Sequence, residues 1–319
     1  KNIINVSIIF LGVFLYSRYK NIKLKSVVIV LLFSTGLSPI SSVVMFGVGL
    51  PLYYSIPFGI LIGTLSGFLI VELASHVITF HRGYDLYNVG FAGGILAFAY
   101  FSIFKLLNIE YTTNLIYTNK QHLLLLFLFI TICLVYIVGG LILNKQPLKE
   151  YLKILKASGR AITDFTRKDN QPLTMINIGL TGLAALLVLL LLNVHMNGPV
   201  FGGLITIVGF SAFGKHPRNV IPPMIGVLLV TLIFNIELSV PVVLAIIFST
   251  ALAPIAGEHG FIIGILAGML HLPVVLSLGQ LHGGVLLYSN GFAAAFTAVI
   301  FTTVIHTFKR SDRDGITRV

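Results

Sequence analysis

The chain alternates between long apolar runs and short polar loops. Residues 123–143 and residues 174–194 contain no charged side chain. A helix of about 20 residues crosses the roughly 30 Å hydrocarbon core of a bilayer, so both runs predict membrane-spanning helices. The apolar residues are continuous and do not alternate with polar ones, which argues against the spanning strands of a β-barrel. The pattern therefore predicts a helical membrane protein.

Further apolar segments, separated by Pro, Gly or polar residues, fill most of the remaining chain. They cover residues 3–16, 26–34, 40–50, 58–78 and 84–106 in the first part, and 200–213, 220–234, 240–253, 261–278 and 285–308 in the last part. Several are shorter than a full crossing requires. Short helices that are broken at matching places in two halves are typical of a transport site.

Two distant blocks of the sequence resemble each other. Residues 81–92 (HRGYDLYNVGFA) and 282–293 (HGGVLLYSNGFA) are identical at seven of twelve positions, at a constant offset of 201. The same offset relates the Gly-x-x-x-Gly-x-x-x-Gly run that starts at Gly59 to the one that starts at Gly260. Identity at a fixed offset indicates an internal duplication.

The duplication divides the chain into four parts. We expect a first repeat at 1–106, a linker at 107–172, a second repeat at 173–309 and a cytoplasmic tail at 310–319. The linker contains one spanning helix and a basic stretch, 145–168, whose pattern predicts an amphipathic helix on the membrane surface. The counterpart of the helix at 174–194 would precede Lys1, so we expect the first repeat to be incomplete at its N-terminus.

The orientation of the two repeats follows from the number of crossings. If each complete repeat crosses an even number of times, the single spanning helix of the linker inverts the second repeat. One observation conflicts with this. The basic loop at 18–25 aligns, with a small gap, with the basic loop at 215–218, and equivalent basic loops favour the same side. We expect inverted repeats because an uncharged run of 21 residues fits only across the bilayer. The predicted fold class is an all-α polytopic membrane protein.

Composition agrees with a chain that is mostly embedded in lipid. Hydrophobic residues make up 56% of the sequence and charged residues only 10%, whereas a soluble domain has roughly 25% charged residues. The net charge of +11 collects in short loops beside apolar runs, which is the signature of cytoplasmic loops and argues against nucleic acid as a partner. The single Cys133 excludes a disulfide framework. These features favour the bacterial cytoplasmic membrane.

The two related blocks, with the glycine runs before them, resemble a family of uncharacterised bacterial multi-pass membrane proteins defined by a duplicated region. The resemblance covers both repeats and implies a polytopic membrane fold, but it brings no activity with it. The paired short helices and the segment 197–203 (NGPVFGG) are also loosely similar in layout to urea transporters. The selectivity-filter motif of those transporters is not recognisable in this chain.

The candidate site residues begin with a duplicated histidine. His81 and His282 each follow an apolar helix and precede a glycine, so each is expected where a helix breaks. Backbone freed at a break inside a membrane protein must be buried in protein or face a watery cavity. A histidine there binds a solute, relays protons or coordinates a metal, or else it only caps the helix end. Tyr87 and Tyr288, six residues further on, offer a hydroxyl group to the same regions.

Acidic residues close to apolar segments are the second group of candidates. Asp85 stands four residues after His81, which places both on one face if the stretch is helical. Glu258 and His259 lie between two helices of the second repeat, where the first repeat has Pro57 and Phe58. Polar residues that occur in only one of the two repeats are what coupling to protons or cations requires. An exposed loop at this position would also explain Glu258 and His259.

These features predict a membrane transporter or channel for a small solute or ion, with its pathway between the repeats. The lipid bilayer is the expected partner, and no metal, other cofactor or catalytic residue is predicted. A His-rich metal or haem protein is an alternative, although no His-x-x-x-His or His-Glu-x-x-His spacing occurs. A scaffold subunit without a pathway is another. Association with further copies of the chain stays open.

Overall fold

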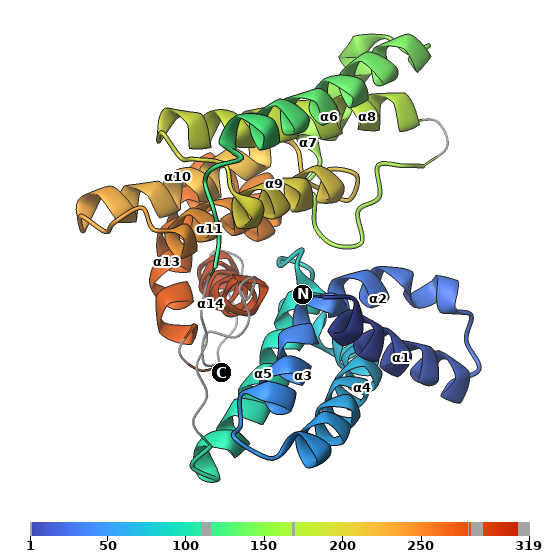
Figure 1. Cartoon of the computed structure of the whole chain (residues 1–319). Coiled ribbons are helices and arrows are strands. Elements are labelled where there is room, and N and C mark those ends of the chain that lie inside the picture. Colours follow the sequence, from blue (N-terminus) through green and yellow to red (C-terminus); the bar gives the residue numbers. More distant parts are fainter. Residues whose placement is uncertain (1, 110–115, 168–169, 280, 282–289, 312–319) are drawn as a thin grey trace, which may run out of the picture. The chain divides into compact units, whose positions relative to one another are not determined.

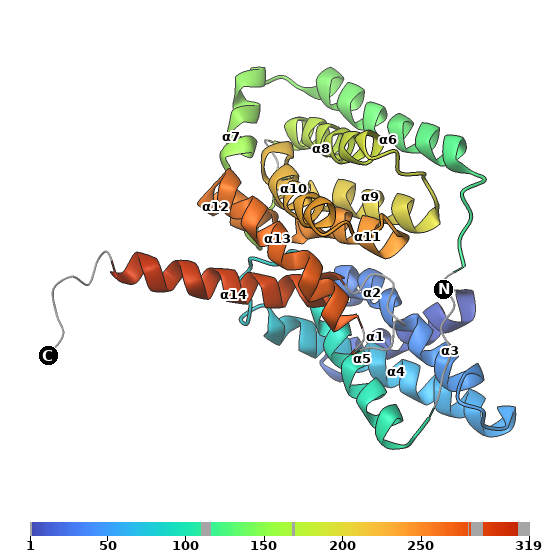
Figure 2. The ribbon, with the colours of Figure 1, turned by 90° about the vertical axis from the view of Figure 1, so that its left-hand side faces the viewer.

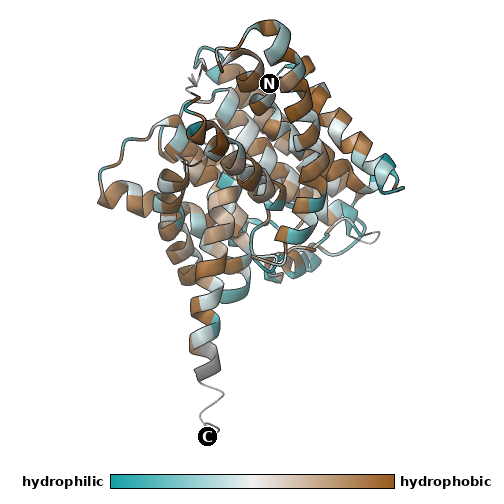
Figure 3. Cartoon of the chain, turned by 90° about the horizontal axis from the view of Figure 1, so that it is seen from below, coloured by the Kyte–Doolittle hydropathy of each residue, from teal (hydrophilic) through white to brown (hydrophobic). Residues whose placement is uncertain are grey.

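The described part of the chain is entirely helical apart from its loops. A computed structural model describes residues 2–109, 116–167, 170–279, 281 and 290–311, and no strand occurs within these ranges (Figure 1). Eight helical stretches in them are long and apolar enough to cross a membrane. Apolar residues cover most of the helices, and polar ones gather at their ends (Figure 3). The prediction of an all-α polytopic membrane protein is confirmed.

The chain forms two compact units. Unit 1 comprises Lys1–Phe80, Tyr87–Ile116 and Val275–Ala293, and unit 2 comprises His81–Leu86, Tyr117–Val274 and Ala294–Val319. The short segment His81–Leu86 therefore belongs to unit 2, although the helices on either side of it belong to unit 1.

Unit 1 is built around Ile3–Tyr19 (α1) and Leu52–Val77 (α4), which pack along each other in the same direction. Its elements are α1 (Ile3–Tyr19), η1 (Leu24–Val27), α2 (Val28–Ser34), η2 (Thr35–Leu37), α3 (Ser38–Phe46), α4 (Leu52–Val77) and α5 (Asn88–Leu106). Gly12 of α1 packs against Gly67 of α4, where any side chain would overlap the backbone of the partner helix. The glycine run thus lets two helices approach closely, as small residues do in membranes.

Unit 2 contains the rest of the helices. They are α6 (His122–Leu143), η3 (Leu148–Glu150), α7 (Tyr151–Lys156), α8 (Gln171–Leu191), α9 (Gly198–Phe210), α10 (Pro217–Ile233), α11 (Val240–Phe248), η4 (Ser249–Leu252) and α12 (Ala253–His259). α13 (Phe261–Leu278) and α14 (Asn290–Ser311) are divided between the units. α8 packs along α6, α9 and α10 (Figure 2).

The predicted linker, residues 107–172, contains less helix in its described part than its pattern predicts. Only η3 and α7 are helical in the basic stretch, and the chain is irregular from Ala157 to Phe165. Phe165 N donates to Ala212 O at 2.9 Å, which ties this irregular part to the loop between α9 and α10. The second half of the predicted surface helix therefore packs against the protein.

One span of unit 2 is unusual because it is buried and broken. α11, η4 and α12 follow one another without a loop and form the 20-residue span Val240–His259, in which 89% of the apolar window is buried. The buried share of the corresponding window is only 17% for His122–Leu143. A tighter turn in mid-helix often marks a functional hinge, and here η4 lies at the middle of the span. In unit 1, η2 breaks the span Leu24–Phe46 in the same manner.

α1 and α10 begin in the same way. Each has 17 residues, and in each the N-cap backbone donates to the side chain of an asparagine at the third helical position. In α1, Asn2 and Asn5 exchange two bonds of 2.9 Å between side chain and backbone. In α10, His216 N donates to Asn219 Oδ1 at 2.9 Å, while the His216 ring contacts Ala157 O at 3.0 Å. Such bonds satisfy backbone groups that the first helical turn leaves free.

The two helices also end in the same way. Asn21 and Asn235 adopt left-handed conformations with φ of 53° and 49°, and each is followed by an isoleucine. The isoleucine N–H then reaches back to the helix, from Ile22 to Ser17 O and from Ile236 to Thr231 O, at 2.9 Å in both cases. This 6→1 bond is typical of a Schellman motif. A constant offset of 214 relates the two helices.

The predicted alignment of the two basic loops is therefore wrong. Loop 18–25 follows α1, whereas loop 215–218 lies where α10 begins, so the loops occupy opposite ends of matching helices. The error arises from a difference in length further along the chain. Residues 47–58, which include the first residues of α4, stand between α3 and the first glycine of its run, whereas Gly260 follows α12 directly. An alignment anchored on the glycine runs misses this difference.

Candidate functional site

The segment His81–Leu86 is non-helical and buried in unit 2. His81, Tyr84 and Asp85 have no exposed surface. Leu86 N donates to Ala251 O in η4 at 3.1 Å, so the segment lies against the break in the buried span. Gly83 has φ of 79°, a conformation that glycine adopts without strain. Predicted residues of the first repeat thus meet the middle of a span from the second.

Lys215 is completely buried beside the same break. Its Nζ donates to Thr250 Oγ1 in η4 at 2.8 Å and lies 5.4 Å from the ring centroid of Phe210. Burial holds the pKa of Lys215 well below its usual range, and the Asp85 carboxylate opposes this shift. A charge in such a place is stable only with a partner of opposite charge. Asp85 is the carboxylate whose negative charge favours the protonated form of Lys215.

The loop that carries Lys215 is held in place by side-chain amides. Asn177 Nδ2 of α8 donates to Ser211 O at 2.8 Å and to Lys215 O at 2.7 Å. Tyr151 of α7 donates its hydroxyl to Asn177 Oδ1 at 3.1 Å. The helix that leads into this loop, α9, has only 13 residues, fewer than a full crossing requires. The backbone position of Lys215 is therefore fixed from two helices.

A second polar cluster lies at the end of α12. Tyr84 donates its hydroxyl to Glu258 Oε1 at 2.7 Å, and its ring stacks with that of His259 at 5.8 Å between centroids. Arg160 places its guanidinium 4.3 Å from the centroid of the same ring and 3.9 Å from Glu258 Oε2. Burial, followed by the bond to Glu258, raises the pKa of Tyr84 to about 12. Tyr84 therefore stays protonated and donates to Glu258.

A segment of the linker covers both clusters. We call residues 157–161 the strap. Its backbone packs so closely on Gly83, Gly214 and Gly257 that a side chain at any of them would overlap it. Ala161 N donates to Gly83 O at 3.0 Å, and Arg160 Nε donates to Arg82 O at 2.7 Å. The strap joins the segment His81–Leu86, the loop before α10 and the end of α12.

The structure brings together four of the seven predicted site residues. His81 and Asp85 lie near η4, and Glu258 and His259 lie at the end of α12, all in unit 2. Tyr87 is buried and belongs to unit 1. His282 and Tyr288 lie outside the described residues.

Sequence reasoning missed Lys215, Thr250, Tyr84 and Arg160. Lys215 and Arg160 were interpreted as topological charges because each lies in a basic loop. The unusually short apolar segment before Lys215 was the available signal, because a helix too short to cross leaves its following loop inside the protein. Nothing in the sequence distinguishes Thr250 from the hydroxyl groups that commonly bond to helix carbonyls.

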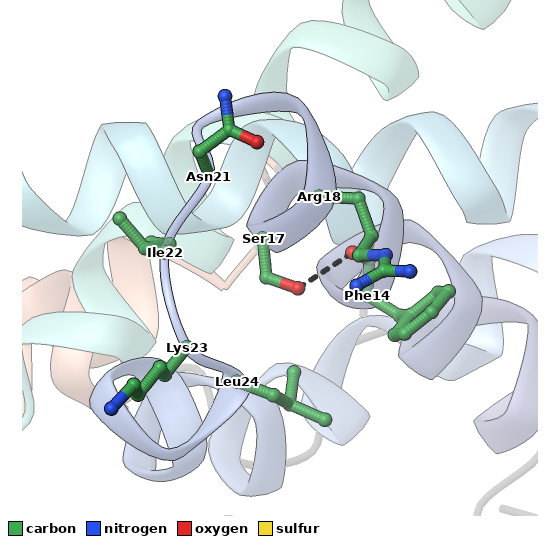
Figure 4. Close-up of a pocket in the computed structure, with 7 residues that line it drawn as sticks. All are labelled: Phe14, Ser17, Arg18, Asn21, Ile22, Lys23 and Leu24. Carbon is green, nitrogen blue, oxygen red and sulfur yellow. Dashed lines mark hydrogen bonds between the residues drawn. The ribbon is translucent and has the colours of Figure 1, made fainter.

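Unit 1 has a polar cluster of its own at the end of α1. Glu72 of α4 accepts a hydrogen bond from the Tyr16 hydroxyl, and Lys20 Nζ lies 3.4 Å from its carboxylate. This explains how an acid is tolerated in a spanning helix. Nearby is a surface pocket of about 340 Å³ (Figure 4), lined by Phe14, Ser17, Arg18, Asn21, Ile22, Lys23 and Leu24. Its two cationic side chains are typical of a loop at the membrane surface.

The metal-site alternative gains no support from the described residues. Among them, no group of three or more His, Cys, Asp or Glu side chains is arranged to hold an ion. His122 and His195 pack 5.0 Å apart between ring centroids, and His122 Nδ1 accepts a bond from Met196 N at 2.8 Å. Ring packing and the bond from the Met196 backbone therefore give these two histidines a structural role.

The fold and these clusters define a multi-pass membrane protein with a lysine and an aspartate buried beside a broken span. The chain belongs to the family described as "Protein of unknown function (DUF1576)", whose model matches residues 1–106 and 143–307. The unmatched stretch contains nearly all of α6. No curated protein and no solved structure matches the chain. Because the family has no assigned activity, function has to be argued from the site.

Proposed function

We propose that the protein transports a small solute or ion, as a transporter or channel, along a pathway that passes Lys215 and η4. The observation that carries this proposal is the fully buried Lys215 bonded to Thr250 at the middle of a buried, broken span. Asp85 and His81 come from the first predicted repeat, and Lys215 and Thr250 come from the second. The site therefore combines residues of both repeats.

A purely structural role explains this arrangement poorly. Replacing a buried ion pair with apolar side chains of similar size is often neutral or stabilising, so the pair is not needed for folding. Ionisable residues inside membrane proteins mark ion and proton pathways. The 3₁₀ turn adds backbone groups outside regular α-helical bonding, and such groups bind ions in transporters. A scaffold subunit requires neither feature.

The likeness of α1 and α10 supports the proposed duplication and extends it beyond the glycine runs. A further support lies within unit 1, where Gly90 of α5 and Gly291 of α14 pack against each other. These residues are equivalent at the offset of 201, and the rings of their neighbours, Phe91 and Phe292, stack at 6.0 Å. Equivalent residues contact each other in this reciprocal way when two copies are related by a two-fold rotation.

The distribution of charge supports repeats that are inserted in opposite directions. If the spans alternate and the Lys20 end of α1 faces the cytoplasm, 13 of the 15 lysines and arginines between Arg18 and Arg218 other than the buried Lys215 face it too. The exceptions are Lys105 and Lys120. At matching positions after α1 and α10, Lys23 faces inward and Glu237 faces outward. We therefore propose inverted repeats in a bacterial cytoplasmic membrane.

Cysteine accessibility tests the proposed pathway. Cys133 is the only cysteine, so Cys133→Ala gives a background in which a new thiol reports alone. Ser249→Cys places a thiol in η4, and Ala185→Cys places a control thiol in the buried part of α8. We expect a small charged methanethiosulfonate reagent to modify the first in membranes and to spare the second. Equal protection of both thiols would leave the scaffold interpretation as the better one.

A further inference from the structure

We propose that the site exchanges one proton on the Lys215 amine for one small monovalent metal cation, Na⁺ or K⁺, at the Asp85 carboxylate. This inference rests on the proposed function and names the ligand class of the same site. Its grounds are the complete burial of both residues, the bond from Lys215 to Thr250 and the position of Thr250 in the mid-span turn.

The charged groups around Lys215 come from a few elements. The segment His81–Leu86 contributes Asp85 and His81, and Asp85 is the carboxylate that acts on Lys215. The loop of Lys215 itself contains His216 and Arg218, while the Thr250 hydroxyl of η4 and the Phe210 ring of α9 contact the Lys215 amine. α7 and α8 reach the loop through the neutral Tyr151 and Asn177 described above. Asp85 is thus the counter-ion.

The proposed exchange follows from charge balance in a buried site. An ammonium on Lys215 and a carboxylate on Asp85 sum to zero, which is the arrangement that burial tolerates. Loss of the proton leaves the carboxylate alone with a net charge of −1. One monovalent cation restores neutrality, whereas a cation added to the protonated pair would leave +1. The site therefore holds a proton or a metal cation, and not both.

Thr250 supplies an oxygen for which the two cations compete. Its hydroxyl donates to Ile247 O at 2.6 Å, so its hydrogen is engaged and its lone pairs face elsewhere. In the protonated state this oxygen accepts the Lys215 ammonium at 2.8 Å. A hard metal cation prefers oxygen ligands of this kind, together with a carboxylate and backbone carbonyls. The last turn of α11, whose carbonyl ends carry partial negative charge, leads into η4.

The exchange step balances without any redox partner. The N–H bond of the Lys215 ammonium breaks and its electron pair stays on nitrogen, which becomes a neutral amine. The proton passes to water on the side from which the metal cation enters, and the cation takes its place at Asp85. One positive charge enters and one leaves, so the site itself stays neutral.

The site occurs once in the chain despite the proposed duplication. At the offset of 214 the counterpart of Thr250 is Gly36, and at the offset of 201 the counterpart of Asp85 is Leu286. Neither counterpart offers an oxygen from its side chain. A single exchange site is therefore expected for each chain.

Proteoliposomes that enclose a pH-sensitive dye test the exchange. At equal ionic strength, an inward gradient of NaCl or KCl should drive proton efflux, and choline chloride should not. Asp85→Asn and Lys215→Met should each abolish the signal, whereas Lys149→Met, on the exposed part of the linker, should retain it. If choline acts as well as both metal cations, or if Asp85→Asn still responds, the inference is wrong.

A binding measurement keeps the test decisive when a variant folds but does not transport. The melting temperature of the purified protein should rise with NaCl or KCl at high pH and respond less at low pH, because protons compete. In Asp85→Asn the carboxylate proposed to hold the cation is absent, so NaCl and KCl should raise the melting temperature no more than choline chloride at either pH. A rise in this variant equal to that of the unaltered protein overturns the inference. If Ser249→Cys is accessible but no cation effect occurs, the pathway stands and the exchange fails.

Discussion

Both broken spans of the molecule are interrupted by a 3₁₀ turn, but they differ in burial and in the side chains at the turn. Leu24–Phe46 is broken by η2 and Val240–His259 by η4, each near its middle, but the buried shares of their apolar windows are 39% and 89%. The turn of the first contains Gly36, and that of the second contains Thr250 bonded to Lys215. Both spans thus share the break, whereas the bond to a buried lysine is described at η4 alone of these two turns.

The largest effect is expected from separating the ion pair. Asp85→Ala leaves the Lys215 ammonium buried without a counter-ion, which costs about 3–5 kcal/mol of folding free energy. Adding Lys215→Met should recover most of this loss, because the double variant buries no charge. Chemical unfolding in detergent measures both. In the other span, Gly36→Ala should change little, because a methyl group there has no neighbour within 4 Å. Equal costs for the single and double variants would contradict the pairing.

The second effect concerns pH and separates the two matching helix caps. Burial lowers the pKa of His216 to about 4, so the folded state prefers the neutral ring while the unfolded state protonates near 6.5. The contribution of His216 to the free energy of unfolding should therefore be fully present above pH 6.5. It should be lost as the pH falls towards 4, by up to about 3 kcal/mol. α1 has Asn2 at the matching position, which does not titrate. His216→Asn should remove this part of the pH dependence, and an unchanged profile would assign it elsewhere.

A third, intermediate effect tests how far the two units are alike. Gly12 and Gly226 both pack against the backbone of a glycine-run helix, with no room for a methyl group. Gly12→Ala and Gly226→Ala should each cost about 1–3 kcal/mol through overpacking. Similar losses of melting temperature would sharpen the comparison. If only one variant loses stability, the two close helix contacts have similar geometry but contribute differently to the free energy of unfolding.

The smallest effect on stability is expected at the strap. Arg160 is partly exposed, so Arg160→Ala should cost about 1 kcal/mol or less. The substitution should have a larger effect on how fast a thiol reagent reaches η4, because Arg160 holds the strap against Glu258 and the carbonyl of Arg82. We expect faster modification of Ser249→Cys from the cytoplasmic side. Lys153→Ala, which breaks only a pair with Glu150 on the exposed part of the linker, is the matched control.

The sequence predicted the class of fold because lipid imposes a simple rule on it. Uncharged runs such as 123–143 must cross as helices, and this needs no tertiary information. The partners of the site were harder to predict. Lys215 is 130 residues from Asp85 along the chain, and both lie in loops that resemble surface loops. Only the packing of His81–Leu86 against Ala251 brings them to the same place. Pairing across such distances has no local signature.

The alignment of the repeats shows where pattern matching stops being reliable. Glycine runs keep their register because their packing permits no insertion, so the offset of 201 holds there. The stretch between the caps and the glycines has no such constraint, and its difference in length was invisible. The C-terminal caps could not have supplied the register either, since Asn108-Ile109 ends α5 with the same left-handed asparagine and 6→1 bond.

The segment His81–Leu86 has a consequence for modularity. It lies between α4 and α5 of unit 1 in the chain, but its side chains complete the interior of unit 2. A gene fragment that begins at Tyr117 would encode nearly all of unit 2 but neither Asp85 nor Tyr84. Its product would bury the Lys215 ammonium without a counter-ion. The two halves of this gene therefore cannot be exchanged between relatives as independent cassettes, and substitutions around residue 85 and residue 215 are expected to be inherited together.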